Sequence, residues 1–391
     1  MTQAAQQPAF TTADPELVRR LLVFGGDDLN MCYQCGTCSV VCPLTPDDQA
    51  FPRKEMLWAQ WGLQDKLLSD GDAWLCHQCN ECTTHCPRDA KPGDLMAATR
   101  TYQIEEYATF KVLAKATNSL KYLPLALIPP VLLTFLMVLF ANILPNDGLF
   151  YPEGDVLFAN FIGHNWVQLF SFIAMGFMGA VSWRGGYRFW KAIRESEVSP
   201  PPVRKGFIGS LMITLGEIGT HKYFKMCRAN KPRGFAHMGI LWGFLFLFIA
   251  TTLAFFYGLF GRELSLPIYD PAKIVGNLGG IALLVGLTWV SARRLLKSDE
   301  AGKSRYFDWY FIGVLYVLTI SGFAVEIARY AELREWAYSI YLFHFVFYFM
   351  LFTYLPYTKF SHVVYRTLAL THARQIGRSP GTRREVVVDL P

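Results

Sequence analysis

Eight of the nine cysteines in this chain lie in two short runs near its N-terminus. The runs are CYQCGTCSVVCP, beginning at Cys32, and CHQCNECTTHCP, beginning at Cys76. Both have the spacing C-x2-C-x2-C-x3-C-P, in which three closely spaced thiolates can wrap one iron-sulfur cubane. The fourth cysteine follows after three intervening residues and precedes a proline. This spacing predicts two [4Fe-4S] clusters.

The fourth cysteine of each run is predicted to bind the cluster of the other run, because that crossing is part of the ligand pattern of bacterial two-cluster ferredoxins. The predicted ligands of one cluster are Cys32, Cys35, Cys38 and Cys86. Those of the second cluster are Cys76, Cys79, Cys82 and Cys42. Structural zinc is the alternative, but zinc sites favour separated C-x2-C pairs with four ligands per metal. Cys227 lies alone in a basic loop and is predicted to be a bystander thiol.

Histidines are candidate axial ligands for haem b in the apolar part of the chain. His344 and His362 lie near the two ends of the segment FHFVFYFMLFTYLPYTKFSH. If this segment is one helix, eighteen residues make five turns and place both imidazoles on one side, about 27 Å apart. That separation is close to the thickness of the hydrocarbon layer. Pro356 removes one backbone hydrogen bond between them, so the shared side is approximate.

Each of these two histidines needs a partner ligand from another helix at the same depth. His237 begins the third apolar segment and is predicted to pair with His362 around one haem. His164 begins the second segment and is the candidate partner of His344 around a second haem. For any one of them, an aromatic-flanked histidine at the membrane interface is the alternative.

Other polar residues receive no ligand assignment. His221 is a reserve ligand, but its position four residues after Glu217 favours a solvated role. His372 lies in the basic tail and is expected at the surface. Glu326 and Lys359 are candidates for proton transfer or for interfacial anchors.

The apolar residues that must position these histidines concentrate after residue 123, in a chain that is 52% hydrophobic and 17% charged. Six runs approach the length of about 20 residues that spans a bilayer. They lie near 123–144, 161–183, 236–258, 273–291, 309–328 and 338–358. The shorter stretch 206–219 has apolar residues at helical spacing opposite polar ones, which indicates a helix lying in the membrane interface.

The sequence therefore predicts an α fold, with a soluble two-[4Fe-4S] ferredoxin-like helical head fused to a six-helix transmembrane cytochrome b bundle. The head is a cytoplasmic domain over residues 1–93, and a linker helix over 94–122 follows it. The membrane dihaem cytochrome b domain covers 123–362. A cytoplasmic basic tail covers 363–391.

Charge predicts the orientation of this chain in the membrane. Lysine and arginine concentrate in the second-to-third and fourth-to-fifth connections, whereas the first-to-second connection holds acidic residues and no cation. The first thirty residues also lack the basic flank and apolar region of a signal peptide. Both cues predict a multi-pass protein of the cytoplasmic (inner) membrane with both termini in the cytoplasm. The net charge of +6 then needs no nucleic acid partner, and cysteines in a reducing compartment favour metal ligation over disulfides.

The head resembles the two-cluster C subunit of heterodisulfide reductases, and the body resembles the cytochrome b subunits of the heterodisulfide reductase E and nitrate reductase gamma type. The pattern H-x11-P-x2-K-F-x-H, from His344 through Pro356 to His362, carries the second resemblance. Their fusion in one chain, from about Leu29 to His362, is similar to the C subunit of the quinone-interacting membrane-bound oxidoreductase (Qmo) complex.

This resemblance implies a subunit of a membrane-bound quinone oxidoreductase complex with two b haems and two [4Fe-4S] clusters. Proteins of this kind exchange electrons between menaquinone or menaquinol and QmoA-like and QmoB-like flavo-iron-sulfur subunits, which serve adenylylsulfate reductase in dissimilatory sulfur metabolism. Two features depart from the related families. The third apolar segment has only His237 where nitrate reductase gamma subunits carry two histidines on one earlier helix. The cysteine-rich CCG motif is also absent, so this chain is not expected to cleave a disulfide.

Two other classes of function are compatible with parts of the sequence. One is a membrane anchor and electron conduit of a heterodisulfide-reductase-like complex, with no quinone site in this chain. The other is a transporter with a regulatory iron-sulfur head, which is disfavoured because the intramembrane histidines lie at depths suited to axial ligation.

Overall fold

The computed structural model describes residues 12–45, 49–146, 151–195, 203–225, 231–262, 266–296 and 302–378. Within these ranges the chain forms helices and turns and no strand, which confirms the predicted α class. Packing divides the chain into two compact units. Unit 1 comprises Met1–Tyr107, Gly186–Glu217 and Val364–Pro391, and unit 2 comprises Ala108–Gly185 and Ile218–Val363. Both units are therefore discontinuous in sequence.

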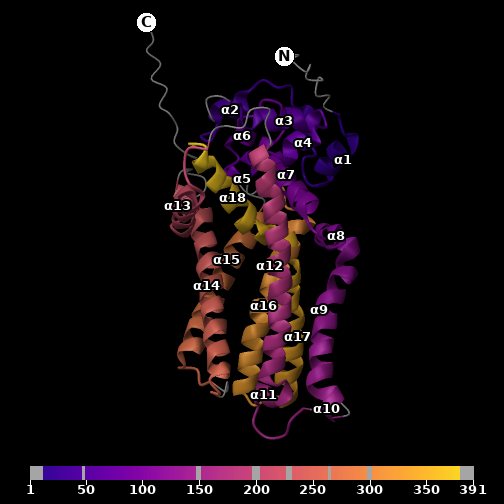
Figure 1. Cartoon of the computed structure of the whole chain (residues 1–391), viewed down its shortest axis with the longest axis vertical. Coiled ribbons are helices and arrows are strands. Elements are labelled where there is room, and N and C mark those ends of the chain that lie inside the picture. The colour runs from indigo at the N-terminus through magenta and orange to yellow at the C-terminus, as the bar shows by residue number, and fades with distance from the viewer. Residues whose placement is uncertain are drawn as a thin grey trace, which may run out of the picture. The chain divides into compact units, whose positions relative to one another are not determined.

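The N-terminal part of unit 1 consists of short helices joined by tight loops (Figure 1). They are α1 (Pro15–Val23), α2 (Thr37–Val41), α3 (Arg53–Gln60), α4 (Gln64–Leu68), α5 (Asp72–Leu75), α6 (Glu81–Thr84) and α7 (Pro92–Tyr107). The start of α1 is fixed locally, because the Asp14 carboxylate accepts a hydrogen bond from the Glu16 amide at 2.9 Å and Pro15 occupies the first helical position.

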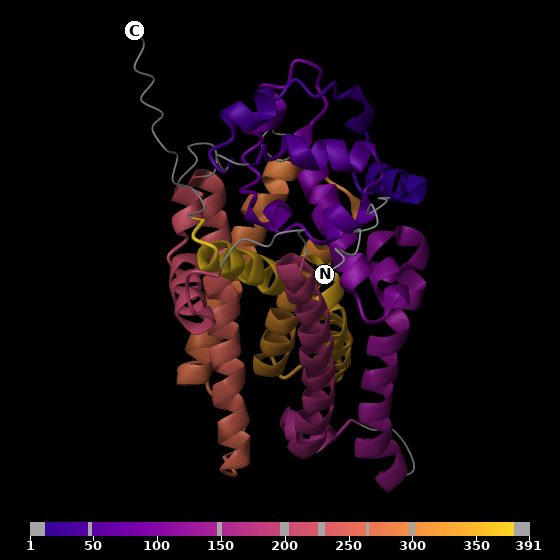
Figure 2. The same ribbon diagram turned by 45° about the horizontal axis from the view of Figure 1, so that its top comes forward.

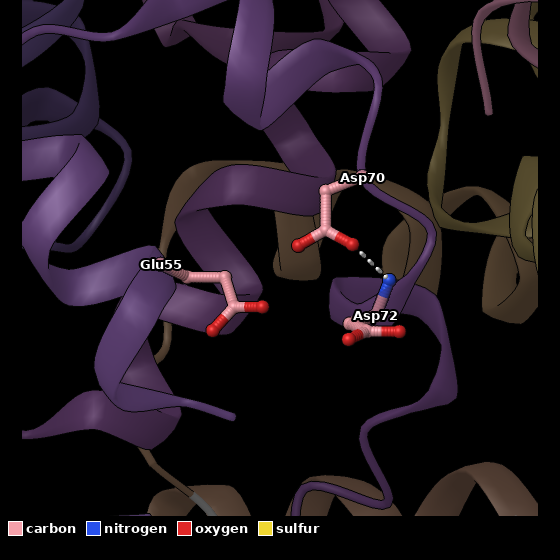
Figure 3. A group of neighbouring side chains, drawn as sticks. All are labelled: Glu55, Asp70 and Asp72. Atoms are coloured by element: carbon pink, nitrogen blue, oxygen red, sulfur yellow. Dashed lines mark hydrogen bonds between the residues drawn. The ribbon is translucent and has the colours of Figure 1, made fainter. Parts of the chain in front are cut away.

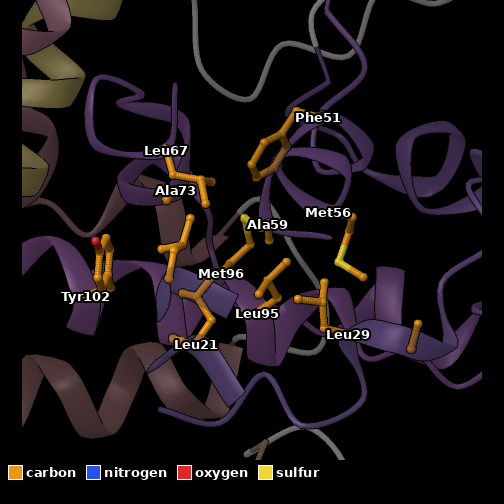
Figure 4. Packing of buried hydrophobic residues seen from close by; sticks show 13 residues of the cluster. Leu21, Leu29, Phe51, Met56, Ala59, Leu67, Ala73, Leu95, Met96 and Tyr102 are labelled. Atoms are coloured by element: carbon orange, nitrogen blue, oxygen red, sulfur yellow. The ribbon is translucent and has the colours of Figure 1, made fainter. Parts of the chain in front are cut away.

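One apolar core lies between these helices (Figure 4). Its buried residues are Leu17, Leu21, Leu29, Phe51, Met56, Ala59, Leu67, Ala73, Ala90, Leu95, Met96, Ala98 and Tyr102. The side chains of Cys32, Cys42, Cys76 and Cys86 pack against it. Packing against this core therefore anchors both cysteine runs, because burial of apolar surface is the main force that stabilises a folded domain.

The predicted linker helix over 94–122 is wrong as a single helix. α7 ends at Tyr107, and a second helix, α8 (Lys111–Asn118), follows after a break. α7 lies in the core of unit 1, where Leu95, Met96 and Tyr102 are almost completely buried. The sequence of α7 is only weakly amphipathic. The reason is that a helix covered on most sides needs no polar face.

Unit 1 also contains segments from the second half of the chain. These are the end of α12 (His164–Glu195), most of α13 (Phe207–Gly219) and most of α18 (His362–Gln375). Trp74 stacks on Tyr365 with ring centroids 5.1 Å apart, and Phe189 contacts both rings edge-on. α13 buries Ser210 and Thr214 and exposes Ile208 and Met212, the arrangement expected if its apolar side faces lipid.

Unit 2 contains the helices of membrane length, which run lengthwise beside one another (Figures 1 and 2). Among the described residues, the helices that are long and apolar enough to cross a membrane give six spans, as predicted: Leu120–Ile143, His164–Glu195, Pro232–Leu259, Pro271–Leu295, Tyr306–Tyr330 and Arg334–Tyr357. The corresponding helices are α9 (Leu123–Val138), α12, α14 (Lys231–Leu259), α15 (Pro271–Leu295), α16 (Tyr306–Tyr330) and α17 (Arg334–Tyr354). Two short helices, α10 (Leu144–Asn146) and α11 (Phe158–Phe161), lie between the first two spans in sequence.

Neighbouring spans pack in the order α14, α15, α16, α17 and α9. Glycines let α14 and α15 approach closely: a Cβ atom on Gly243 would lie 2.8 Å from the Leu283 amide nitrogen, and one on Gly286 would lie 2.7 Å from the Ala236 carbonyl oxygen. Small residues at helix contacts are the usual means of close packing in membranes.

The prediction that one helix carries both His344 and His362 is wrong. α17 ends at Tyr354, two short 3-10 turns follow over Leu355–Tyr357 and Lys359–Ser361, and α18 begins at His362. Pro356 has no amide hydrogen, and Thr358 between the turns is extended, with φ −105° and ψ −178°. The two imidazoles therefore belong to different helices, and His362 stands at a helix start.

Candidate functional site

The two cysteine runs adopt the same backbone conformation at matching positions. Gln34 and Gln78, which precede the second cysteine of each run, both have left-handed φ values, of 65° and 51°. Gly36 and Asn80, which follow that cysteine, are also left-handed, with φ of 86° and 63°. Strained backbone of this kind is kept where surrounding structure or a bound group requires it. Equal conformations in two separate runs indicate equal functions.

A pocket in unit 1 brings together the four cysteines that were predicted to bind the second cluster. Cys76, Cys79 and Cys82 line it from the second run, and Cys42 lines it from the end of the first. Apolar residues such as Phe51 and Met96 complete its wall. This is the crossing arrangement expected of two-cluster ligand runs. The chemistry of the donor set, four sulfur atoms around one pocket, fits an iron-sulfur cubane.

The other four cysteines lie close enough for their thiols to influence one another. Burial raises the pKa of the Cys32 thiol, and the neighbouring thiols of Cys86 and Cys35 raise it further. Burial likewise raises the pKa of Cys38 to about 11. In the second set of ligands, burial raises the pKa of Cys42 to about 12. Buried thiols with such values stay protonated unless a metal ion compensates the charge of the thiolate. Bound iron would supply that compensation.

Several donors approach these sulfur atoms and the loops that hold them. The backbone amide nitrogen of Gln78 lies 3.3 Å from Cys76 Sγ, and that of Ala90 lies 3.4 Å from Cys86 Sγ. From α18, the Arg366 guanidinium donates to the Cys76 carbonyl at 2.9 Å. Hydrogen bonds and charges near the sulfurs tune the potential of a cluster. No local pattern in the sequence points to Arg366, because 290 positions separate it from Cys76.

A cluster inside unit 1 contains the carboxylates of Glu55, Asp70 and Asp72, whose oxygen atoms lie within 4.8 Å of one another (Figure 3). The Lys54 ammonium lies 3.3, 3.4 and 2.9 Å from them, respectively. Arg378 adds a second cation, 2.7 Å from Asp72. The lysine thus occupies the position that a metal ion would take in such a group.

The carboxylates of this charged cluster divide into two kinds. Burial opposes the ionisation of Asp72, but Lys54 and Arg378 outweigh burial and lower its pKa to about 2. Burial raises the pKa of Glu55 well above its ordinary value, and Asp70 and Asp72 add to the increase despite Lys54. The two pKa shifts therefore have opposite signs: Asp72 is the ionised partner of the two cations, whereas burial of Glu55 favours its protonated form.

In unit 2 the structure brings together His237 of α14 and His362 of α18. Their ring centroids are 6.1 Å apart and the ring planes are inclined by 78°. Two metal–nitrogen bonds of about 2 Å each, together with the radius of each ring, place the centroids of two axial imidazoles roughly 6 Å apart. The spacing of this pair therefore fits a haem iron held between them.

The outward nitrogen of each imidazole has a hydrogen-bond partner. His362 Nδ1 lies 2.6 Å from the Lys359 carbonyl oxygen, and His237 Nδ1 lies 3.0 Å from Nε2 of His221. The predicted solvated role of His221 is wrong, because this residue is only 3% exposed and its ring contacts His237. Ligating histidines commonly have their second nitrogen held in this way.

His344 of α17 is half-buried and also has an oriented ring. Its Nδ1 lies 2.9 Å from the Ser321 hydroxyl, whose own proton goes to the Leu318 carbonyl at 3.1 Å. His344 Nδ1 must then be the donor, which leaves Nε2 as the nitrogen with a lone pair. The ring therefore has the tautomer that a ligand requires.

His164 differs from His344. Its Nε2 accepts a hydrogen bond from the side-chain amide of Gln168 at 2.7 Å. The same nitrogen lies so close to Gly258 that a Cβ atom at that position would collide with it. Across the described residues, the structure gives no ring contact between His164 and His344. The pairing of these two histidines around a second haem stays a prediction.

The remaining polar candidates form ion pairs or ring contacts. Glu326 lies 3.2 Å from the Asn277 amide and 3.5 Å from the Lys273 ammonium, and Lys359 pairs with Asp308. His372 is half-buried against Trp190 rather than on the surface, and burial, with help from nearby arginines, lowers its pKa to about 4. Cys227 lies outside the described residues.

Comparison with known proteins gives two matches to protein families. Residues 117–383 match the family described as Citrate utilization protein B, and residues 28–90 match the 4Fe-4S dicluster domain. The dicluster match confirms the predicted iron-sulfur domain at the N-terminus. No solved structure matches this chain.

Curated relatives include components of heterodisulfide reductases. The chain is 31% identical over 164 residues to the E subunit of dihydromethanophenazine:CoB–CoM heterodisulfide reductase of Methanosarcina acetivorans, covering 37% of this chain and 60% of the relative. It is 37% identical over 106 residues to a protein of Archaeoglobus profundus that is named as similar to the heterodisulfide reductase C subunit, covering 27% and 55%. It is 36% identical over 87 residues to the C subunit of the H2:CoB-CoM heterodisulfide,ferredoxin reductase of Methanothermobacter marburgensis, covering 22% and 47%.

The chain thus spans about half to three fifths of the length of the relatives it matches. The predicted resemblance to heterodisulfide reductase C and E subunits is confirmed, with both likenesses carried by one chain. Since the longer match covers more than half of the sequence, this protein belongs to the Citrate utilization protein B family and carries a 4Fe-4S dicluster domain ahead of that region.

Proposed function

We propose that this chain is the membrane electron-transfer subunit of a quinone oxidoreductase complex, passing electrons between menaquinone or menaquinol and a soluble flavo-iron-sulfur partner. When bound, b haems and [4Fe-4S] clusters supply single-electron transfer. The observation that carries the proposal is the His237–His362 pair, whose 6.1 Å spacing suits two axial ligands of one iron. The heterodisulfide reductase relatives support the wider class, an oxidoreductase subunit.

The ligand residues divide between the two kinds of cofactor. His237 and His362 would hold one haem through Nε2, because the Nδ1 atom of each faces an acceptor. His344 would hold a second haem, for which His164 is the proposed partner. The eight cysteines of unit 1 would hold the two clusters, with Cys42 and Cys86 as the crossing ligands.

The partners follow from the relatives and from the resemblance of the sequence. The C and E subunits named among the relatives are parts of larger reductases, so this chain is proposed to work with further subunits. We propose flavo-iron-sulfur subunits of the QmoA and QmoB type, with adenylylsulfate reductase as the enzyme served in dissimilatory sulfur metabolism. The E-subunit relatives are named for dihydromethanophenazine, a reduced carrier, which favours a carrier of the same redox class here.

The proposed location is the cytoplasmic membrane, with both termini in the cytoplasm. Six helices of spanning length would return the chain to its starting side. The excess of lysine and arginine in the second-to-third and fourth-to-fifth connections supports that side as cytoplasmic.

The test is a reduced-minus-oxidised spectrum of the purified full-length chain, with iron and acid-labile sulfide measured on the same sample. We expect a b-type signal together with sulfide for two clusters. Addition of a menaquinol analogue should reduce the haem, and a quinone-site inhibitor should shift its spectrum. A haem that responds to neither reagent would favour the alternative, an electron-conducting anchor without a quinone site. Protein without haem would contradict the proposal.

A further inference from the structure

His221 is a buried histidine with a strained backbone, and it has no proposed role as a ligand. It is 3% exposed and follows α13, just before the 3-10 turn over Lys222–Lys225. Its backbone is left-handed, with φ of 52°, a conformation that residues other than glycine rarely adopt. Such strain persists where the surroundings require the side chain to point in one direction. That direction is toward the ring of His237, 5.1 Å away between centroids.

The hydrogen bonds of His221 fix which nitrogen carries the proton. Its Nδ1 lies 3.4 Å from the Gly219 carbonyl oxygen, which can only accept. The proton of a neutral His221 ring is therefore on Nδ1, and Nε2 is an acceptor. Because Nε2 lies 3.0 Å from His237 Nδ1, the proton of that contact belongs to His237. The lone pair of the His237 ring is consequently on Nε2.

The same tautomer occurs on the opposite ring of the pair. His362 Nδ1 donates to the Lys359 carbonyl at 2.6 Å, so the His362 lone pair is also on Nε2. A backbone carbonyl performs for His362 what an imidazole performs for His237. His221 is therefore the side chain that accepts the Nδ1 proton of His237, as the Lys359 carbonyl accepts that of His362.

We propose that His221 is a positioning residue that fixes the tautomer and ring orientation of His237 as an axial ligand of haem iron. The inference rests on the proposed function, because it requires a haem between His237 and His362. An acceptor on Nδ1 increases the basicity of a ligating imidazole and stabilises the oxidised metal. Loss of the acceptor is therefore expected to raise the midpoint potential of this haem.

Two other roles would place His221 in the same position. It could be a ligand itself, or its ring could only fill space beside Phe224, whose ring centroid is 5.6 Å from that of His221 and 5.0 Å from that of His237. The substitutions His221→Gln, His221→Leu, Phe224→Leu and His237→Ala distinguish these roles. Glutamine can place its amide oxygen where Nε2 of His221 lies, whereas leucine fills the space without an acceptor.

The experiment uses full-length protein and measures haem content, the low-spin electron paramagnetic resonance spectrum and the haem midpoint potential. We expect His221→Leu to retain haem with a raised potential, altered g-values and haem loss about 10- to 100-fold faster. His221→Gln should restore the wild-type potential, and Phe224→Leu should leave it unchanged. Cluster absorbance checks that each variant is folded.

Three outcomes would overturn the inference. A His221→Leu protein with the wild-type spectrum and potential would show that the ring only fills space. Loss of haem as complete as in His237→Ala would make His221 a ligand. If His221→Leu does not fold, a His221→Gln potential that differs from wild type contradicts the proposal, and one that matches supports it. Wild-type protein without haem would instead remove the proposed function.

Discussion

The cysteine runs and the histidines proposed as haem ligands differ in how far apart in the sequence the predicted ligands lie. Each cysteine run supplies four ligands within eleven residues, from Cys32 to Cys42 and from Cys76 to Cys86. The histidines come from separate helices, and the pair whose spacing fits one iron comes from α14 and α18. Local spacing can therefore specify a cluster, whereas the pairing of haem ligands depends on how the helices pack.

The candidate histidines also differ in which ring nitrogen forms a hydrogen bond. His237, His344 and His362 each direct Nδ1 at an acceptor, whereas Nε2 of His164 accepts from Gln168. The difference shows that depth in the membrane is a weaker criterion than whether Nε2 already accepts a hydrogen bond. A histidine at the right depth can still have its ligating nitrogen engaged elsewhere.

The largest expected effect is on the crossing of the cysteine runs. Cys42→Ser and Cys82→Ser should each lower acid-labile sulfide by about half, because both remove a ligand of the same cluster. Their electron paramagnetic resonance spectra should lose the same component. Cys227→Ser is the matched control and should change neither measurement. If Cys42→Ser lost the component that Cys32→Ser loses, the crossing would be wrong.

The next effect concerns the histidine pair. His237→Ala and His362→Ala should remove the same b-type component from the reduced-minus-oxidised spectrum, since an iron that loses one of two axial imidazoles loses its low-spin signature. His372→Ala, which alters a half-buried histidine beside Trp190, serves as control and should leave the spectrum unchanged.

The third prediction tests the proposed pairing of His344 with His164. If His344 and His164 hold one haem, both alanine variants should lose a common component that differs from the first. Loss in His344→Ala with retention in His164→Ala would assign the partner of His344 to another side chain. That outcome would agree with the engagement of His164 Nε2 by Gln168.

A smaller effect is expected in the charged cluster of unit 1. Asp72→Asn should destabilise the folded protein by about 3–5 kcal/mol, because Lys54 and Arg378 lose their ionised partner in a buried site. Glu55→Gln should not destabilise the protein at neutral pH and should leave it at least as stable as wild type, because glutamine does not carry the cost of a raised glutamate pKa. Heat-induced loss of cluster absorbance measures both. Equal destabilisation by the two substitutions would contradict the division between these carboxylates.

The pH dependence of these two variants has opposite signs. The folded pKa of Asp72, about 2, is below its ordinary value of about 3.9, so its contribution is present above that ordinary value and is lost as pH falls toward 2. The advantage of wild type over Asp72→Asn should be constant from pH 7 to 5 and narrow below about pH 4. The raised pKa of Glu55 costs wild type stability as pH rises above about 4.3, a loss that Glu55→Gln should not show.

The smallest effect is on cluster potential. Arg366→Gln removes a cation that donates to the Cys76 carbonyl at 2.9 Å, and nearby positive charge favours the reduced, more negative cluster. The potential of the cluster bound by Cys76 should fall, while its iron content is unchanged. Arg374→Gln, on the same helix as Arg366, removes a cation paired with Glu217 and should leave the potential as it was. A redox titration followed by electron paramagnetic resonance compares the two.

The sequence by itself determined the features that depend on short-range order. The repeated C-x2-C-x2-C-x3-C-P spacing identified the dicluster domain, because the loop around a cubane involves residues only a few positions apart. Hydrophobic length alone identified the six spans, because a bilayer requires about 20 apolar residues whatever their order. The likeness to heterodisulfide reductase components also followed from local patterns.

Only the tertiary structure decided how distant residues meet. The break between α17 and α18 placed His344 and His362 on separate helices, since Pro356 and the extended Thr358 interrupt the helical hydrogen bonds. Packing brought His221 to His237 and Arg366 to the Cys76 loop, contacts that no periodicity predicts. A buried polar group needs a hydrogen-bond partner, and that partner comes from the helices that pack around it. Local sequence does not specify which helices those are.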